Sequence, residues 1–175
     1  MKNFLIGFCL ISFLLPITAQ SKKSKKENTY ATKERLFYIE RVKNKNIISY
    51  DVNLNKENKP DPEQPLNVYW INREKNPGEK EELSHTEERM AYGYKVLKSD
   101  SDTIKITLTA FDSRILSLVS HDNNYICLVD IDKQPARLDK IYVKTTKPNS
   151  LSVEYVELYG INISSGKSCS ERIKP

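Results

Sequence analysis

The residues best suited to chemistry form a cluster of aromatic and charged side chains in the middle of the chain. Flat aromatic rings give contact area, and a few charged groups orient a ligand or move protons. The candidate ligand-binding residues are Tyr69, Trp70, Arg73, Glu88, Arg89, Tyr92 and Tyr94. The alternative interpretation, which we favour, is structural: a short helix closes one end of a β domain, with Trp70 in the core. Arg89 would then pair with Glu40 or Asp51.

Other combinations that could support catalysis or metal binding are weaker. His85 and His121 are the only histidines, and neither has neighbours at the spacing of zinc ligands. The sequence has no serine nucleophile elbow, no phosphate-binding loop and no dinucleotide fingerprint. We therefore assign no catalytic residue, no metal site and no cofactor.

Two of the three cysteines lie in the body of the chain, because Cys9 falls in the N-terminal apolar segment. In an oxidising compartment, an even pair such as Cys127 and Cys169 predicts one disulfide. The alternative is two free thiols. Cys127 lies in the apolar stretch 125–131 and would then be a small core residue.

The N-terminus has the pattern of a secretory signal peptide. Lys2 precedes an apolar run over 4–15, Pro16 ends the run, and Ala19 supplies the small residue before a cleavage point. The run is too short to span a bilayer, which takes about 20 apolar residues. We expect residues 1–19 to be removed on export to the periplasm or the extracellular space, with no transmembrane span in the mature chain that begins at Gln20.

Residues 20–34 are predicted to be a basic, flexible leader, and residues 35–175 a single β-rich domain. The leader has five lysines and two glutamates, whereas the domain has 22 basic and 21 acidic residues. Because binding to nucleic acid needs a basic surface on the domain itself, a nucleic-acid partner is not expected.

Short segments rich in Ile, Val, Tyr and Thr, with apolar residues at every second position, dominate the domain. They predict strands over 36–42, 47–54, 66–71, 103–109, 114–119, 125–131, 138–145 and 151–163. The expected fold is all-β and mainly antiparallel, a small barrel or sandwich of about eight or nine strands. In 151–163 the apolar phase shifts, which indicates a bulge or a strong bend.

One short helix is predicted over 84–92. Ser84 and Glu87 have the spacing of a capping box, and Gly93 is placed to end the helix. Such a short helix must be held by packing against the rest of the domain.

Several ordered motifs resemble an exported bacterial family that is known only as a domain of unknown function. They are the segments 36–41, 46–53, 68–70, 88–94 and 155–160, and the resemblance covers nearly all of 36–174. It implies an envelope or secreted location and assigns no activity and no functional residue.

Three functions remain open at this point. The first is a binding or accessory module of the cell envelope, with a small apolar or aromatic ligand in its interior. The second is a hydrolase-type enzyme that uses Glu, Arg and Tyr near residues 87–94. The third is an interaction module that binds an envelope protein through an exposed edge strand. The oligomeric state is not determined by the sequence.

Overall fold

The computed structural model describes residues 34–42, 44–100, 102–146 and 152–174. The predicted signal peptide, residues 1–19, lies outside the described residues, as does the predicted leader up to residue 33. The first strand begins at Arg35.

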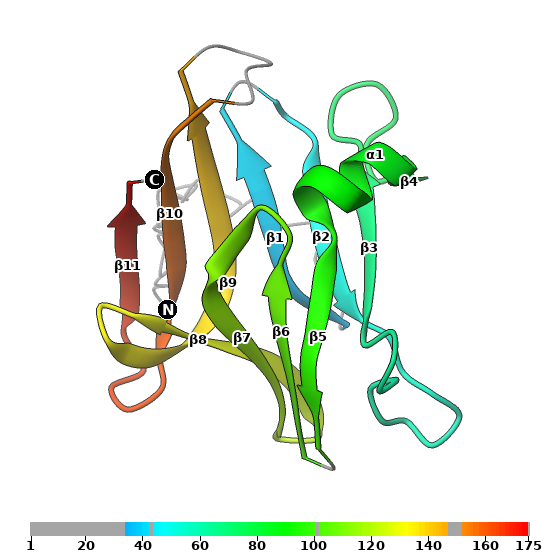
Figure 1. Cartoon of the computed structure of the whole chain (residues 1–175), viewed down its shortest axis with the longest axis vertical. Coiled ribbons are helices and arrows are strands. Elements are labelled where there is room, and N and C mark those ends of the chain that lie inside the picture. The colour runs from blue at the N-terminus through cyan, green and yellow to red at the C-terminus, as the bar shows by residue number, and fades with distance from the viewer. Residues whose placement is uncertain (1–33, 43, 101, 147–151, 175) are drawn as a thin grey trace, which may run out of the picture.

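Eleven strands and one short helical segment make up the fold (Figure 1). The strands are β1 (Arg35–Arg41), β2 (Ile47–Val52), β3 (Leu66–Ile71), β4 (Lys80–Glu82), β5 (Tyr94–Ser99), β6 (Thr103–Leu108), β7 (Phe111–His121), β8 (Asn124–Ile131), β9 (Gln134–Thr145), β10 (Val153–Asn162) and β11 (Ser168–Ile173). The helical segment is α1 (His85–Glu87), which continues as a π-helical turn, η1 (Glu88–Tyr92).

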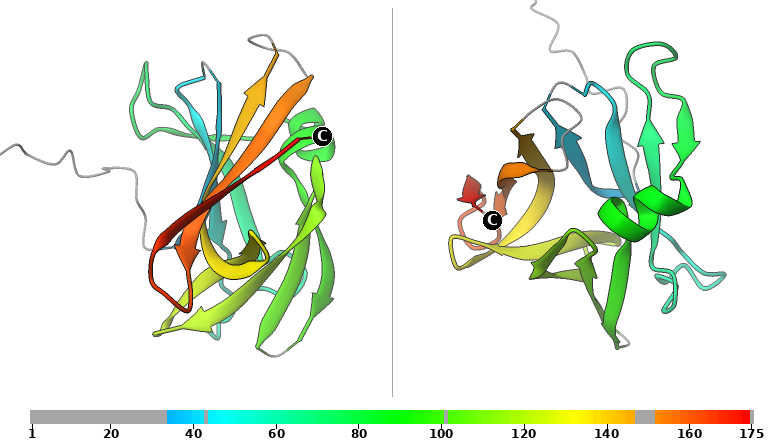
Figure 2. Two further views of the ribbon diagram at one scale, coloured as in Figure 1. Left: turned by 90° about the vertical axis from the view of Figure 1, so that its left-hand side faces the viewer. Right: turned by 45° about the horizontal axis from the view of Figure 1, so that its top comes forward.

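The strands form one curled sheet, a half-barrel, in the order β4-β3-β2-β1-β9-β8-β7-β6-β5. The long strand β9 organises it: its first half pairs with β8, its second half pairs in parallel with β1, and β10 lies along its other side, followed by β11. All other pairs are antiparallel. The meander β5–β8 therefore bends away from β1–β3 and lies in front of them, and Figure 2 shows the curl from two further directions.

The concave side of the curl is a packed apolar core. The rings of Phe37 and Tyr50 stack with centroids 4.5 Å apart, and both side chains are almost fully buried. Strands from both halves contribute to this core, which also contains Ile48, Ile106, Leu108, Leu116, Leu118, Leu138 and Leu158, each about 2% exposed or less. Burial at this level is the main favourable term that holds the two halves together.

The all-β, mainly antiparallel fold with one short helix is confirmed, and the eight predicted strands are all present. The structure adds β4, β5 and β11, which bring the count to eleven. These three strands lie at the free edges of the sheet and are mostly exposed. Edge strands bury little, so their sequences have only weak apolar alternation, and charged residues there oppose edge-to-edge aggregation.

The predicted irregularity near the C-terminus is confirmed as two register shifts in β10. One lies between Val153 and Tyr155 and the other between Tyr159 and Gly160. At the second shift a Cβ on Gly160 would collide with the carbonyl oxygen of Arg137, so only glycine allows β10 to lie this close to β9.

The predicted Cys127–Cys169 disulfide is absent, and both thiols are free. The side chain of Cys127 is fully buried in the core, whereas Cys169 lies on the edge strand β11. Strands β9 and β10 stand between β8 and β11 in the sheet. Burial raises the pKa of the Cys127 thiol far above its usual range, which makes it unreactive.

Candidate functional site

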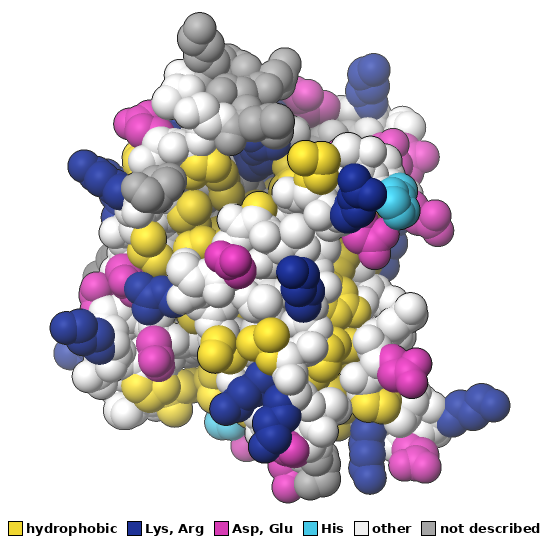
Figure 3. Space-filling view, viewed as in Figure 1, with side chains coloured by type: hydrophobic (Ala, Val, Ile, Leu, Met, Phe, Trp, Pro, Cys, Tyr) yellow, Lys and Arg dark blue, Asp and Glu magenta, His cyan; other side chains and the backbone are white. Residues whose placement is uncertain are grey.

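The curl does not close, and a groove of about 940 Å³ lies along the seam between β3 and β5. Figure 3 shows hydrophobic side chains gathered in a band between these two strands. The apolar part of the lining comes from Leu66, Val68, Leu83, Tyr94 and Val96, and charged groups surround it: Glu63, Glu82, Glu88, Arg89 and Lys95. The groove is the main candidate binding site because it combines an apolar floor with charged margins.

The helical turn closes one end of the seam, and the capping box predicted for it is confirmed. The Ser84 hydroxyl accepts from the backbone N–H of Glu87, and the Glu87 carboxylate accepts from the Ser84 backbone at 2.9 Å. That carboxylate also accepts from the Trp70 indole N–H at 3.3 Å. Burial favours the protonated acid, but these hydrogen bonds outweigh it and lower the pKa of Glu87.

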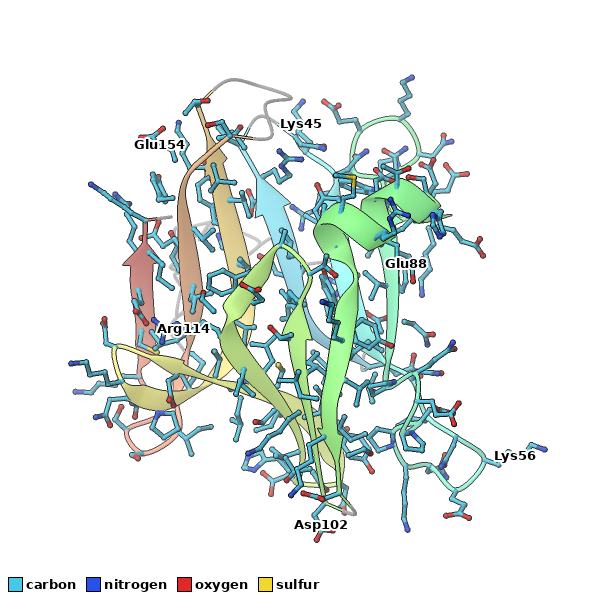
Figure 4. The ribbon with its side chains drawn as sticks, viewed as in Figure 1. Lys45, Lys56, Glu88, Asp102, Arg114 and Glu154 are labelled. Atoms are coloured by element: carbon cyan, nitrogen blue, oxygen red, sulfur yellow. The ribbon has the colours of Figure 1, made fainter. Side chains whose placement is uncertain are left out.

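Gly93 ends the helical segment as predicted. Its N–H donates to the carbonyl of Glu88 at 2.8 Å, a bond five residues back that makes the last turn a π-helix. A Cβ at this position would collide with the same carbonyl oxygen. The close turn places Glu88 over the upper end of the seam, as Figure 4 shows.

Tyr94 joins the two sides of the seam. From β5 its hydroxyl donates to the carbonyl oxygen of Leu66 at 3.1 Å and accepts from the N–H of the same residue at 3.2 Å. Burial raises the pKa of this hydroxyl, so it stays protonated at neutral pH. A tyrosine side chain therefore satisfies a β3 backbone position that a neighbouring strand would otherwise pair with.

The predicted candidate residues separate into three places. Glu88, Arg89 and Tyr94 line the groove. Trp70 and Tyr92 lie beneath the helical turn, where their rings make an edge-to-face contact at 5.4 Å. Tyr69 and Arg73 belong to the outer face of the sheet, away from the groove.

The ion pair expected for Arg89 is not formed with either predicted carboxylate. Asp51 lies 3.9 Å from Arg35, and Glu40 pairs with Lys140 at 3.6 Å. Arg89 is exposed on the margin of the groove.

A buried polar cluster on the outer face was not predicted from the sequence. The Ser49 hydroxyl donates to Asp51 at 2.7 Å and accepts from Arg35 Nε at 2.7 Å, while the Tyr69 hydroxyl donates to the other oxygen of Asp51. Burial lowers the pKa of Arg35, against the attraction of Asp51. Alternation in 47–52 marks Ser49 and Asp51 as outward-facing, but pairing with β1 and β3 is what encloses them.

Two further features bear on the kind of site that this is. Within the described ranges no cluster of three or more His, Cys, Asp and Glu side chains is arranged to hold a metal ion. In the same residues no helix has the length and apolarity needed to cross a membrane.

The fold and the groove thus define a β-rich domain with an open seam. The family model for a domain of unknown function, DUF4833, matches residues 37–172, and the chain belongs to that family. No curated protein and no solved structure matches the chain.

Proposed function

We propose that this domain is an exported interaction module that takes an extended segment of a partner protein into the groove between β5 and β3. The observation that carries the proposal is the Tyr94 bridge. The tyrosine and its hydrogen bonds at 3.1 and 3.2 Å reach from β5 to the edge of β3. Neighbouring strands lie roughly 4.8 Å apart, so a gap of about two such spacings has room for one added strand.

The backbone of β5 supports the same mode of binding. The N–H of Thr109 donates to the carbonyl of Gly93 at 2.8 Å, so the polar groups of Gly93 face β6. Because these groups alternate along an antiparallel strand, those of Tyr94 and Val96 face the opposite edge, toward the seam. A partner strand would pair with this edge and place alternate side chains on Leu66, Val68 and Val96.

The interior offers less support for a small apolar ligand. Phe37, Tyr50, Ile106 and Leu118 already fill the concave side, with about 2% of each side chain exposed or less. The margin of the groove has three glutamates, an arginine and a lysine, a balance that favours a peptide with some basic side chains.

The test uses a capped octapeptide that alternates valine with lysine and two substitutions at one position. Val96→Pro removes the N–H that faces the seam and should weaken peptide binding at least tenfold by calorimetry. Val96→Thr keeps that N–H and should bind within about threefold of the unchanged protein, as expected for backbone pairing. Retained circular dichroism would show that the proline variant is folded.

The unchanged protein gives a second readout. Bound peptide should shift the backbone amide resonances of β5 and of residues 66–68. No binding, or shifts confined to other strands, would overturn the proposal.

Export is part of the same proposal, and it depends on the signal pattern in residues 1–19. The intact mass of the protein from culture medium or periplasm should correspond to a chain that begins at Gln20. A secreted chain that retains Met1–Ala19 would contradict it.

A further inference from the structure

A row of tyrosines crosses the outer face of the sheet, on the side opposite the core. The strand registers place Tyr69, Ser49, Tyr38, Lys140, Tyr159 and Ser170 in one continuous line from β3 to β11. The three tyrosines lie on β3, β1 and β10, which are alternate strands. Their backbone positions are therefore roughly 9.6 Å apart, twice the distance between strands. We call this line the tyrosine row.

Each tyrosine of the row has a basic side chain against its ring. Lys80 Nζ lies 4.2 Å from the centroid of Tyr69, and Lys140 Nζ lies 4.4 Å from that of Tyr159. The guanidinium of Arg73 lies 5.7 Å from the centroid of Tyr38. All three rings are partly exposed. The row thus repeats one aromatic ring and one cation at every second strand.

The positive charge here is local rather than a property of the domain. Residues 35–175 are almost balanced in charge, with 22 basic and 21 acidic side chains. Beside Tyr38 and Tyr69, Arg35 adds a further cation, with 7% of its side chain exposed. Its Nη2 group has no hydrogen-bond acceptor within the described part of the chain. A buried donor without an acceptor favours an anionic oxygen nearby.

We propose that the tyrosine row binds a linear acidic polysaccharide with one carboxylate for every two sugars. The C–H face of a sugar ring packs on a flat tyrosine ring, and the carboxylate of the next sugar pairs with the adjacent lysine or arginine. A chain laid across the strands meets a ring and a cation at each second strand. This inference concerns the outer face and is independent of the groove.

Charge spacing favours a polysaccharide over a nucleic acid. A stacked nucleic-acid strand has one phosphate for about every 3.4 Å of its axis. The tyrosine row has one cation for roughly every 9.6 Å across the strands. The lower charge density of an alternating polymer matches this repeat, and export would bring the domain to the compartment where such polymers are found.

The experiment measures binding of a hyaluronan octasaccharide, in which every second sugar has a carboxylate, at low ionic strength. Lys140→Gln and Tyr159→Leu should each weaken binding at least fivefold. The matched controls are Lys98→Gln on β5 and Tyr125→Leu on β8, which remove the same groups away from the row and should change binding less than twofold. Added salt should weaken binding, since the attraction is partly between exposed charges.

Other probes decide between the alternatives. A neutral cello-oligosaccharide of the same length should bind at least tenfold more weakly, and single-stranded oligothymidylate should not compete. If the octasaccharide does not bind the unchanged protein, or the control variants lose as much affinity as the row variants, the proposal is wrong. Tighter binding of oligothymidylate would also overturn it and point to a nucleic acid.

A readout on the unchanged protein protects the test from variants that fail to fold. The octasaccharide should shift the amide resonances of β1, β9 and β10 and leave those of β5 and β6 in place. The opposite pattern would assign the sugar to the groove and contradict the proposal.

Discussion

Gly93 is the residue at which local geometry leaves least choice. It lies at the junction of the π-helical turn and β5, and its Cα touches the backbone of Glu88 closely enough that a Cβ would collide with the carbonyl oxygen. The spacing of Ser84, Glu87 and Gly93 predicts a capped helix that ends here, and the structure confirms it. The π-helical form of the last turn is not visible in the sequence, because it depends on packing over Trp70 and Tyr92.

Gly93→Ala should therefore lower the free energy of unfolding by about 1–3 kcal/mol, because the added methyl group must push the turn away from the sheet. The shift should change the fluorescence of Trp70, whose indole is bonded to Glu87. Gly166→Ala is the control, since a Cβ there meets no atom within 4 Å. It should leave the Trp70 spectrum unchanged, and a similar change in both variants would contradict the explanation.

Cys127 makes a second prediction at the residue scale, on stability at alkaline pH. Its ordinary pKa is 9.0, and burial raises the pKa in the folded protein. Below about pH 9 the thiol is protonated in both states, so it has no effect on stability. Above that pH the unfolded chain loses the proton and the folded protein does not, so stability falls by up to about 1.4 kcal/mol per pH unit.

Urea unfolding at a series of pH values above 8, in reductant, measures this dependence. Cys127→Ala should remove about one group's share of the slope, whereas Cys169→Ala should remove less, because Cys169 is only partly buried. Tyr50 should add a further decrease above its ordinary pKa of 10.0, since burial raises its pKa as well. An unchanged slope in Cys127→Ala would refute the assignment.

At the scale of elements, the seam between β3 and β5 is the feature that function depends on most. Tyr94 holds it through two hydrogen bonds to one backbone position, and the ring is half-buried. Tyr94→Phe should cost about 1–2 kcal/mol of unfolding free energy, because each lost bond contributes about 0.5–1.5 kcal/mol.

Tyr125→Phe is the matched control, since it removes a single long bond, 3.3 Å, to the carbonyl of Asn58 at an exposed site. It should cost less than about 0.5 kcal/mol. Chemical denaturation compares the two variants directly. Equal losses would mean that Tyr94 does not join the sides of the seam.

The elements found by sequence and those missed differ in burial. Strands such as β2 and β6 place apolar side chains in the core at every second residue, so their alternation is evident. In β4 every residue is exposed, and β5 and β11 are exposed along most of their length. Their strand state depends on hydrogen bonds to a neighbour, a condition that local sequence does not express.

At the scale of the whole molecule, Glu171 ties the C-terminal strand to the front of the curl. Its carboxylate pairs with Arg114 from β7 and accepts from the backbone N–H of Asp132 at 2.9 Å. Arg114 also donates to the carbonyl of Asp130 at 3.3 Å. Figure 4 shows Arg114 on the side of β7 that faces β11. Three segments distant in sequence therefore meet at one carboxylate.

Glu171→Gln keeps the shape of the side chain and removes the charge that Arg114 requires. The loss should be about 1–2 kcal/mol of unfolding free energy, because this pair is more than three-quarters buried on average. Glu74→Gln removes the same charge from an exposed pair with Lys45 and should change stability by less than about 0.5 kcal/mol. Thermal or urea unfolding of both variants decides the matter.

The candidate site was predictable only in part. Glu88, Arg89 and Tyr94 do line one groove, because they follow each other through a single tight turn. Tyr69 and Arg73 are close in sequence to Trp70 but lie on the other face of the sheet, since side chains alternate across a strand. The polar cluster around Asp51 and the tyrosine row join residues from as many as six strands, which no local pattern brings together.

The sequence by itself determined the class of fold, the capped turn and the bulge in β10, because each depends on neighbours within a few residues. The tertiary structure decided how β9 divides its partners between β8 and β1, and hence the curl, the open seam and the tyrosine row. The parallel pairing of β1 with β9 joins residues about one hundred positions apart. Such pairing depends on the burial of one shared core, and that is a property of the whole chain rather than of any segment.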